Sequence, residues 1–138
     1  MSTSLPPLSA ALDAASAPPL RHEALAVLRS LDPAGGSMFV LRVLKTYLGS
    51  LDRYLPEIQA ARGRGDTAAL RMVVHSLKSS SLQIGAEPFG QLCAEIERDL
   101  VAHGLDSPGM DQRLAVLAAD AEGIRRRVEW TLAAEAAR

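Results

Sequence analysis

His75 and Lys78 are the two residues of this sequence best placed to do chemistry together. They stand three positions apart in the run H-S-L-K-S-S-S-L-Q-I-G-A, which extends from His75 to Ala86 within a helical pattern. At about 100° per residue, His75 lies roughly 140° around the helix from the apolar position Leu70, so it is expected to face solvent. A neutral imidazole is a nucleophile, and a lysine one turn later can balance the charge of an anion. The spacing therefore predicts an imidazole that takes up an anion, and it does not favour a metal site.

Polar and small residues share this side of the helix with His75. Arg71, Ser79 and Leu82 fall on the same side. The opposite, apolar side contains Leu70, Val74, Leu77, Ser81 and Ile84. We expect Ser79 to keep the surface low enough for a partner to approach the histidine. Ser80 and Ser81 are better explained as bonding the carbonyl groups of the preceding turn.

The run resembles the phosphorylation-site motif of histidine-containing phosphotransfer (HPt) domains, H-x-L-K-G-[SA]-[SA]-x-x-x-G-A. The positions His75, Leu77, Lys78, Ser80, Gly85 and Ala86 match that motif. Ser79 departs from it, because a glycine is usual there. The resemblance also includes the preceding apolar helix with its Gly65-Asp66 corner, and the following helix with Leu92-Cys93 and Ile96-Glu97. It covers about a hundred residues, from roughly Leu20 to the final helix.

The resemblance implies a function and a set of roles. In this family the histidine carries a phosphoryl group between the aspartates of response-regulator receiver domains. By this resemblance His75 would be phosphorylated, Lys78 would stabilise the phosphoryl charge, and Glu97 would hold the second ring nitrogen and orient the imidazole. Arg71, Ser79 and Leu82 would form the docking surface for the receiver. The expected partners are receiver domains and a hybrid sensor kinase.

A second function, from a different class, stays open. The chain could be a helical interaction module that binds a receiver or another signalling partner without being phosphorylated, and the departure at Ser79 is the best support for it. The other two histidines add no alternative site. His22 stands near a helix start, and His103 suits a helix C-terminus electrostatically.

Composition excludes several other functions. The net charge of −1 at pH 7 argues against nucleic-acid binding, and no run approaches the roughly 18 apolar residues of a membrane span. The Arg125-Arg126-Arg127 run is expected to be a solvated helix face. No Gly-rich phosphate loop or nucleotide-binding motif is present, so we expect a phosphocarrier without autokinase activity. It needs no cofactor of its own on this interpretation, and Mg²⁺ would come with the receiver.

The single cysteine fits a reducing compartment, and no signal peptide is apparent, so we expect a cytoplasmic protein. Cys93 shares the apolar side of its helix with Ile96 and Leu100, which predicts a buried thiol without a chemical role.

The elements that position His75 are all expected to be helices. Residues 1–19 are rich in Ser, Ala and Pro and are expected to form a flexible tail, whereas residues 20–138 form one domain. The expected helices are about 20–31, 38–62 after an N-cap at Ser37, 67–84 after Asp66, 87–102, and one that Ser107-Pro108 starts. Pro56 should kink or split the second of them. The predicted fold is therefore all-α: an up-down four-helix bundle with a short accessory N-terminal helix.

Overall fold

The computed structural model describes residues 18–138, and in this part of the chain the structure is helical throughout, with no strand. The predicted tail lies almost entirely outside the described residues. The elements, in chain order, are α2 (His22–Ser30), α3 (Met38–Gly63), α4 (Thr67–Gln83), α5 (Glu87–His103), the 3-10 turn η1 (Gly104–Asp106) and α6 (Met110–Ala136).

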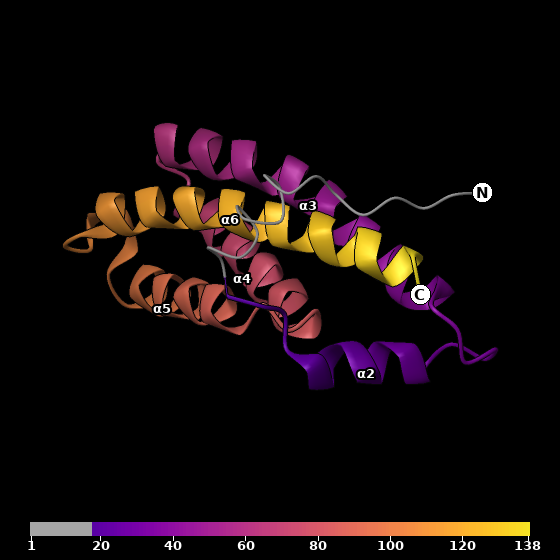
Figure 1. The fold of residues 1–138 in the computed structure, drawn as a ribbon. Coiled ribbons are helices and arrows are strands. Elements are labelled where there is room, and N and C mark those ends of the chain that lie inside the picture. The colour runs from indigo at the N-terminus through magenta and orange to yellow at the C-terminus, as the bar shows by residue number, and fades with distance from the viewer. Residues whose placement is uncertain (1–17) are drawn as a thin grey trace.

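The four long helices form the bundle that the sequence predicts. Neighbouring helices in the chain run antiparallel, and α6 closes the bundle by packing against both α3 and α5 (Figure 1). Leu, Ile, Val and Ala side chains fill the core, with Phe89 and Tyr47 as its buried aromatic residues. The helix order and the composition of the core confirm the all-α fold class.

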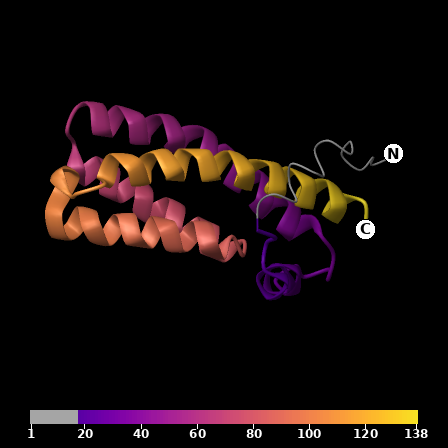
Figure 2. The ribbon, with the colours of Figure 1, turned by 60° about the vertical axis from the view of Figure 1, so that its left-hand side comes forward.

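The first described helix, α2, does not continue the bundle. In Figure 2 it is seen nearly end-on while the four long helices run across the picture, so it crosses the end of the bundle. Polar contacts near both of its ends help to hold it there. The Arg21 backbone N–H donates to the Gly85 carbonyl at 2.9 Å, and the Arg29 guanidinium binds the buried carboxylate of Glu135 at 2.7 Å.

The sequence pattern predicts an apolar side of Leu20, Ala24, Val27, Leu28 and Leu31 for this helix, and the buried face of α2 differs from it. Leu20 and Leu28 are buried as expected, but Val27 and Leu31 are exposed and Leu25 is buried instead. Two overlapping apolar stripes fit the same nine-residue helix. One stripe contains positions 24, 27 and 28, and the other contains positions 25 and 28. The angle at which α2 crosses the bundle selects between them.

Pro56 does not split α3, contrary to one of the two expected outcomes. The ring removes one backbone donor, which leaves the carbonyl of Asp52 without its helical partner. Pro56 lies on the exposed side of α3, where water can bind that carbonyl. Leu51 and Ile58 are buried on either side of the proline and hold the helix against the core through this turn.

One predicted capping bond and one predicted helix start need correction. Ser37 stands at the N-cap of α3, but its hydroxyl donates to Glu135 at 2.5 Å, and the carboxylate of Asp32 accepts from the Phe39 backbone N–H instead. The last helix begins at Met110 rather than at Ser107-Pro108. Gly109 has φ +75°, a left-handed conformation that a helix cannot include, so α6 starts after it.

Candidate functional site

The carboxylate of Glu97, on α5, bridges His75 and Lys78, both on α4. One oxygen, Oε2, lies 2.6 Å from Nδ1 of His75, and the other, Oε1, accepts from the Lys78 ammonium at 2.6 Å. The His75 side chain is 57% exposed, whereas Lys78 and Glu97 are 25% and 19% exposed. The imidazole is therefore held at one nitrogen and presented to solvent.

Local sequence fixes the position of His75 on α4. The Asp66 carboxylate caps the helix by accepting from the Ala69 backbone N–H at 3.0 Å, as predicted. Gly85, with φ +84°, ends the helix and turns the chain into α5, where Pro88 stands in the first turn. Because this corner is short, α4 and α5 pack antiparallel along their length, and Glu97 comes to lie opposite His75.

Glu97 is ionised at neutral pH. The hydrogen bond from Lys78 lowers the pKa of this carboxyl, and the contact with His75 acts in the same direction against the opposing effect of burial. A charged acceptor at 2.6 Å favours the proton of a neutral imidazole on Nδ1. The other nitrogen, Nε2, then keeps its lone pair and faces solvent, which is the arrangement a nucleophile needs.

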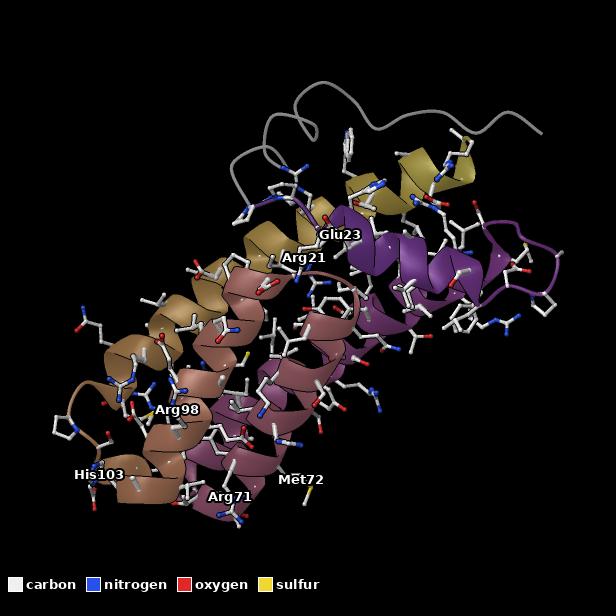
Figure 3. The ribbon with its side chains drawn as sticks, turned by 90° about the horizontal axis from the view of Figure 1, so that it is seen from below. Arg21, Glu23, Arg71, Met72, Arg98 and His103 are labelled. Carbon is white, nitrogen blue, oxygen red and sulfur yellow. The ribbon has the colours of Figure 1, made fainter. Side chains whose placement is uncertain are left out.

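The structure places the other predicted site residues on the same surface. Arg71 lies one turn before His75, and Ser79 one turn after it, and both are exposed. Leu82 follows one turn later and is 41% exposed. Figure 3 shows Arg71 and Met72 at one end of α4, both directed to solvent, and Arg98 on the neighbouring α5. The predicted surface is thus a continuous strip along α4, bordered by α5.

The serines that follow Lys78 have different surroundings. Ser80 donates to the Ser76 carbonyl at 3.0 Å, which confirms the expected bond to the preceding turn. Ser81 does not make that bond. Its hydroxyl is buried and lies 2.8 Å from the Tyr47 hydroxyl of α3, so this prediction was wrong. The reason is tertiary, because a partner on another helix competes with the helix's own carbonyl.

Other reactive side chains lie away from the site or are inert. His22 and His103 are exposed near the start of α2 and at the end of α5, and Figure 3 shows His103 at the far end of its helix. Cys93 is buried as predicted, and burial raises the pKa of its thiol to about 12, which keeps it protonated. Arg125 pairs with Asp52 of α3 at 2.7 Å, so it holds helices together in addition to meeting solvent.

Within residues 18–138, no group of three or more His, Cys, Asp or Glu side chains could hold a metal ion. None of the described helices is both long and apolar enough to span a membrane.

One feature of the site was missed in the sequence: the contact between Leu82 and Gly90. A Cβ atom at Gly90, on α5, would lie 2.6 Å from a terminal carbon of Leu82. The available signal was a glycine in the interior of a helix, which usually has a packing reason. Gly85 shows the same effect at the corner, where a Cβ would lie 2.5 Å from the Arg21 backbone nitrogen.

The fold and the site together define a class of protein: a helical bundle that presents one oriented histidine to solvent. The model of the Hpt domain family matches residues 42–135, which is more than half of the 138 residues, and the chain belongs to that family. Hpt domains are phosphocarriers rather than enzymes; they act by histidine phosphotransfer in phosphorelays and interact with receiver domains of two-component systems. Searches of curated proteins and of solved structures gave no significant match.

Proposed function

We propose that this protein is a phosphorelay intermediate in which His75 accepts a phosphoryl group from a receiver aspartate and passes it to another receiver. The observation that carries the proposal is the bridge formed by Glu97, which holds Nδ1 of His75 and the ammonium of Lys78 at 2.6 Å each. The bridge leaves Nε2 as the free nucleophile and keeps a cation one turn from it.

The transfer step balances without a proton acceptor. The lone pair of Nε2 attacks phosphorus in line, the N–P bond forms, and the P–O bond to the receiver aspartate breaks, which releases a carboxylate. The proton on Nδ1 stays in place, so the phosphorylated imidazole carries a positive charge. The Glu97 carboxylate is 2.6 Å from that nitrogen and stabilises this charge. The same step in reverse delivers the phosphoryl group to the next receiver.

Lys78 acts on the phosphoryl oxygens in this proposal. Its ammonium is bound to Glu97 in the unphosphorylated protein, and its flexible side chain allows it to turn toward a group on Nε2. The phosphoryl group attracts the lysine more strongly once two negative charges are present. The Mg²⁺ ion that the reaction uses is bound by the receiver, and this chain supplies no ligand to it.

The receiver docks on the strip that contains Arg71, Ser79 and Leu82, next to His75. Arg71 supplies a cation facing the acidic phosphorylation site of a receiver, Ser79 keeps the surface low, and Leu82 supplies an apolar contact. The donor is a receiver domain of a hybrid sensor kinase. A cytoplasmic location belongs to the same proposal and rests on the single cysteine, which fits a reducing compartment.

Incubation with a phosphorylated receiver domain tests the proposal. The wild-type chain should acquire an acid-labile, base-stable label, and His75→Gln should acquire none. The melting temperature of His75→Gln should stay nearly unchanged, because the side chain is 57% exposed. His22→Gln and His103→Gln are matched controls that should be labelled as the wild type is. Receiver binding by a wild-type chain that takes up no label would support the non-phosphorylated interaction module instead.

A further inference from the structure

Gly90 is the fourth residue of α5, and its backbone conformation does not require a glycine. Its φ is not positive, unlike that of Gly85 and Gly109, so any residue could adopt its conformation. A glycine within a helix costs roughly 0.5–1 kcal/mol relative to alanine. The reason for this glycine is therefore the space around it.

That space is filled by Leu82 of α4. A Cβ on Gly90 would lie 2.6 Å from Cδ2 and 2.8 Å from Cγ of Leu82, both shorter than any ordinary carbon–carbon contact. Gly49, in the interior of α3, has nothing within 4 Å of the same atom. The missing side chain of Gly90 is thus a notch in α5, and the leucine from the neighbouring helix lies in it.

Leu82 remains part of the surface although it lies in this notch. It is 41% exposed, and it follows His75 by two helical turns, about 10 Å along the axis. The seven-residue separation puts both side chains on one side of α4. The depth at which the notch holds Leu82 therefore sets the height of the surface beside the exposed imidazole.

We propose that Gly90 is a positioning residue for partner docking: it seats Leu82 low against α5, so that a receiver domain can approach His75. The proposal rests on the proposed function. A methyl group at Gly90 would displace the flexible end of Leu82 rather than the backbone, and because Leu82 is 41% exposed, we expect its side chain to move toward solvent. The raised leucine would keep the receiver from closing on the histidine.

The experiment uses Gly90→Ala in the full chain and the receiver domain that phosphorylates the wild type fastest. Gly90→Ala should raise the KM for the phosphorylated receiver about tenfold and change kcat less than about threefold, since docking and not chemistry is affected. Labelling of His75 by phosphoramidate, a donor too small to meet Leu82, should proceed at the wild-type rate.

A double-mutant cycle distinguishes two explanations. Gly90 acts either by allowing Leu82 to lie low against α5 or by contacting the receiver itself. Leu82→Ala should weaken receiver binding a few-fold, and adding it to Gly90→Ala should improve binding to that same level, because no leucine remains to be raised. Gly49→Ala, a glycine change on the side of α3 opposite its buried face, is the matched control and should bind as the wild type does.

This proposal would be overturned if the losses of receiver binding in the two single variants added up in the double variant, or if Gly90→Ala had the wild-type KM. Either result would leave the phosphorelay function standing. Failure of every receiver to label the wild type would instead overturn the proposed function itself. Far-ultraviolet circular dichroism measures the helicity of each variant, and we expect the wild-type value for all of them. A change in KM then reflects the docking surface. A loss of helicity in Gly90→Ala would contradict a displacement of Leu82 alone.

Discussion

The ammonium of Lys78 lies 2.6 Å from a carboxylate oxygen of Glu97, so the lysine of the site is bound to a neighbouring helix in the unphosphorylated protein. Both side chains are partly shielded from solvent, which strengthens the pair relative to an ion pair in water. The lysine therefore has a task before any phosphoryl group arrives. It lowers the pKa of Glu97 and holds this carboxylate in position, and Glu97 in turn orients His75.

Lys78→Ala should slow phosphotransfer by about 10- to 100-fold, on the order expected for one lost transition-state contact. The free energy of unfolding should change by less than about 1 kcal/mol, because the lost pair is only partly buried. Rapid-quench kinetics with a phosphorylated receiver measure the rate. Lys45→Ala, which removes an exposed lysine of α3, is the matched control. If Lys78→Ala took up the phosphoryl group at the wild-type rate, the only role left for Lys78 would be to orient Glu97.

Ser79→Arg should lose both receiver binding and phosphotransfer, because a long side chain one turn after His75 overlaps the docked receiver. Its slow reaction with phosphoramidate should persist. Ser79→Gly should bind at least as well as the wild type and lose several tenths of a kcal/mol of stability through poorer helix propensity. Receiver titrations and thermal melts measure these outcomes. Unimpaired binding by Ser79→Arg would place the docking surface elsewhere.

Glu135→Gln should destabilise the protein at neutral pH and much less in acid. The Arg29 hydrogen bond lowers the pKa of this buried carboxyl to about 2, so its charge stabilises the fold fully above pH 4.5, and that contribution is lost as the pH falls toward 2. The shift corresponds to a free energy on the order of 3 kcal/mol. Urea unfolding at pH 7 and pH 3 measures it. If Glu135→Gln lost the same free energy of unfolding at pH 7 and at pH 3, the effect would come from packing and not from the charge of Glu135.

Ser81→Ala should cost about 1–2 kcal/mol, because the buried hydroxyl of Tyr47 then lacks its partner at 2.8 Å. Tyr47→Phe should cost less, since the Ser81 hydroxyl can turn to the carbonyl of Leu77 on its own helix. The double variant should be more stable than the sum of the two losses predicts. Chemical denaturation of the four proteins completes the comparison, and simple additivity would contradict a direct bond.

The exposed side of α4 was predictable from the sequence. The spacing of Leu70, Leu77 and Ser81 placed His75, Ser79 and Leu82 on the opposite side, and the structure confirms that all three are exposed. Asp66 and Gly85 marked the ends of this helix correctly. These features depend only on the period of a helix and on local capping, which a single sequence contains.

Contacts between helices were decided by the tertiary structure. The period of α4 does not determine that Lys78 binds Glu97, that Ser81 meets Tyr47, or that Leu82 lies in the notch at Gly90. Each depends on the register and separation of two packed helices, and each joins residues of two different helices. The face that α2 buries and the start of α6 depend in the same way on how those segments cross the bundle. The helical period of the sequence therefore determined that His75 faces solvent. The family resemblance named Glu97 as the residue that holds it, but only packing decided the contact itself, because a helical period fixes directions around one axis and contains no distance to the next helix.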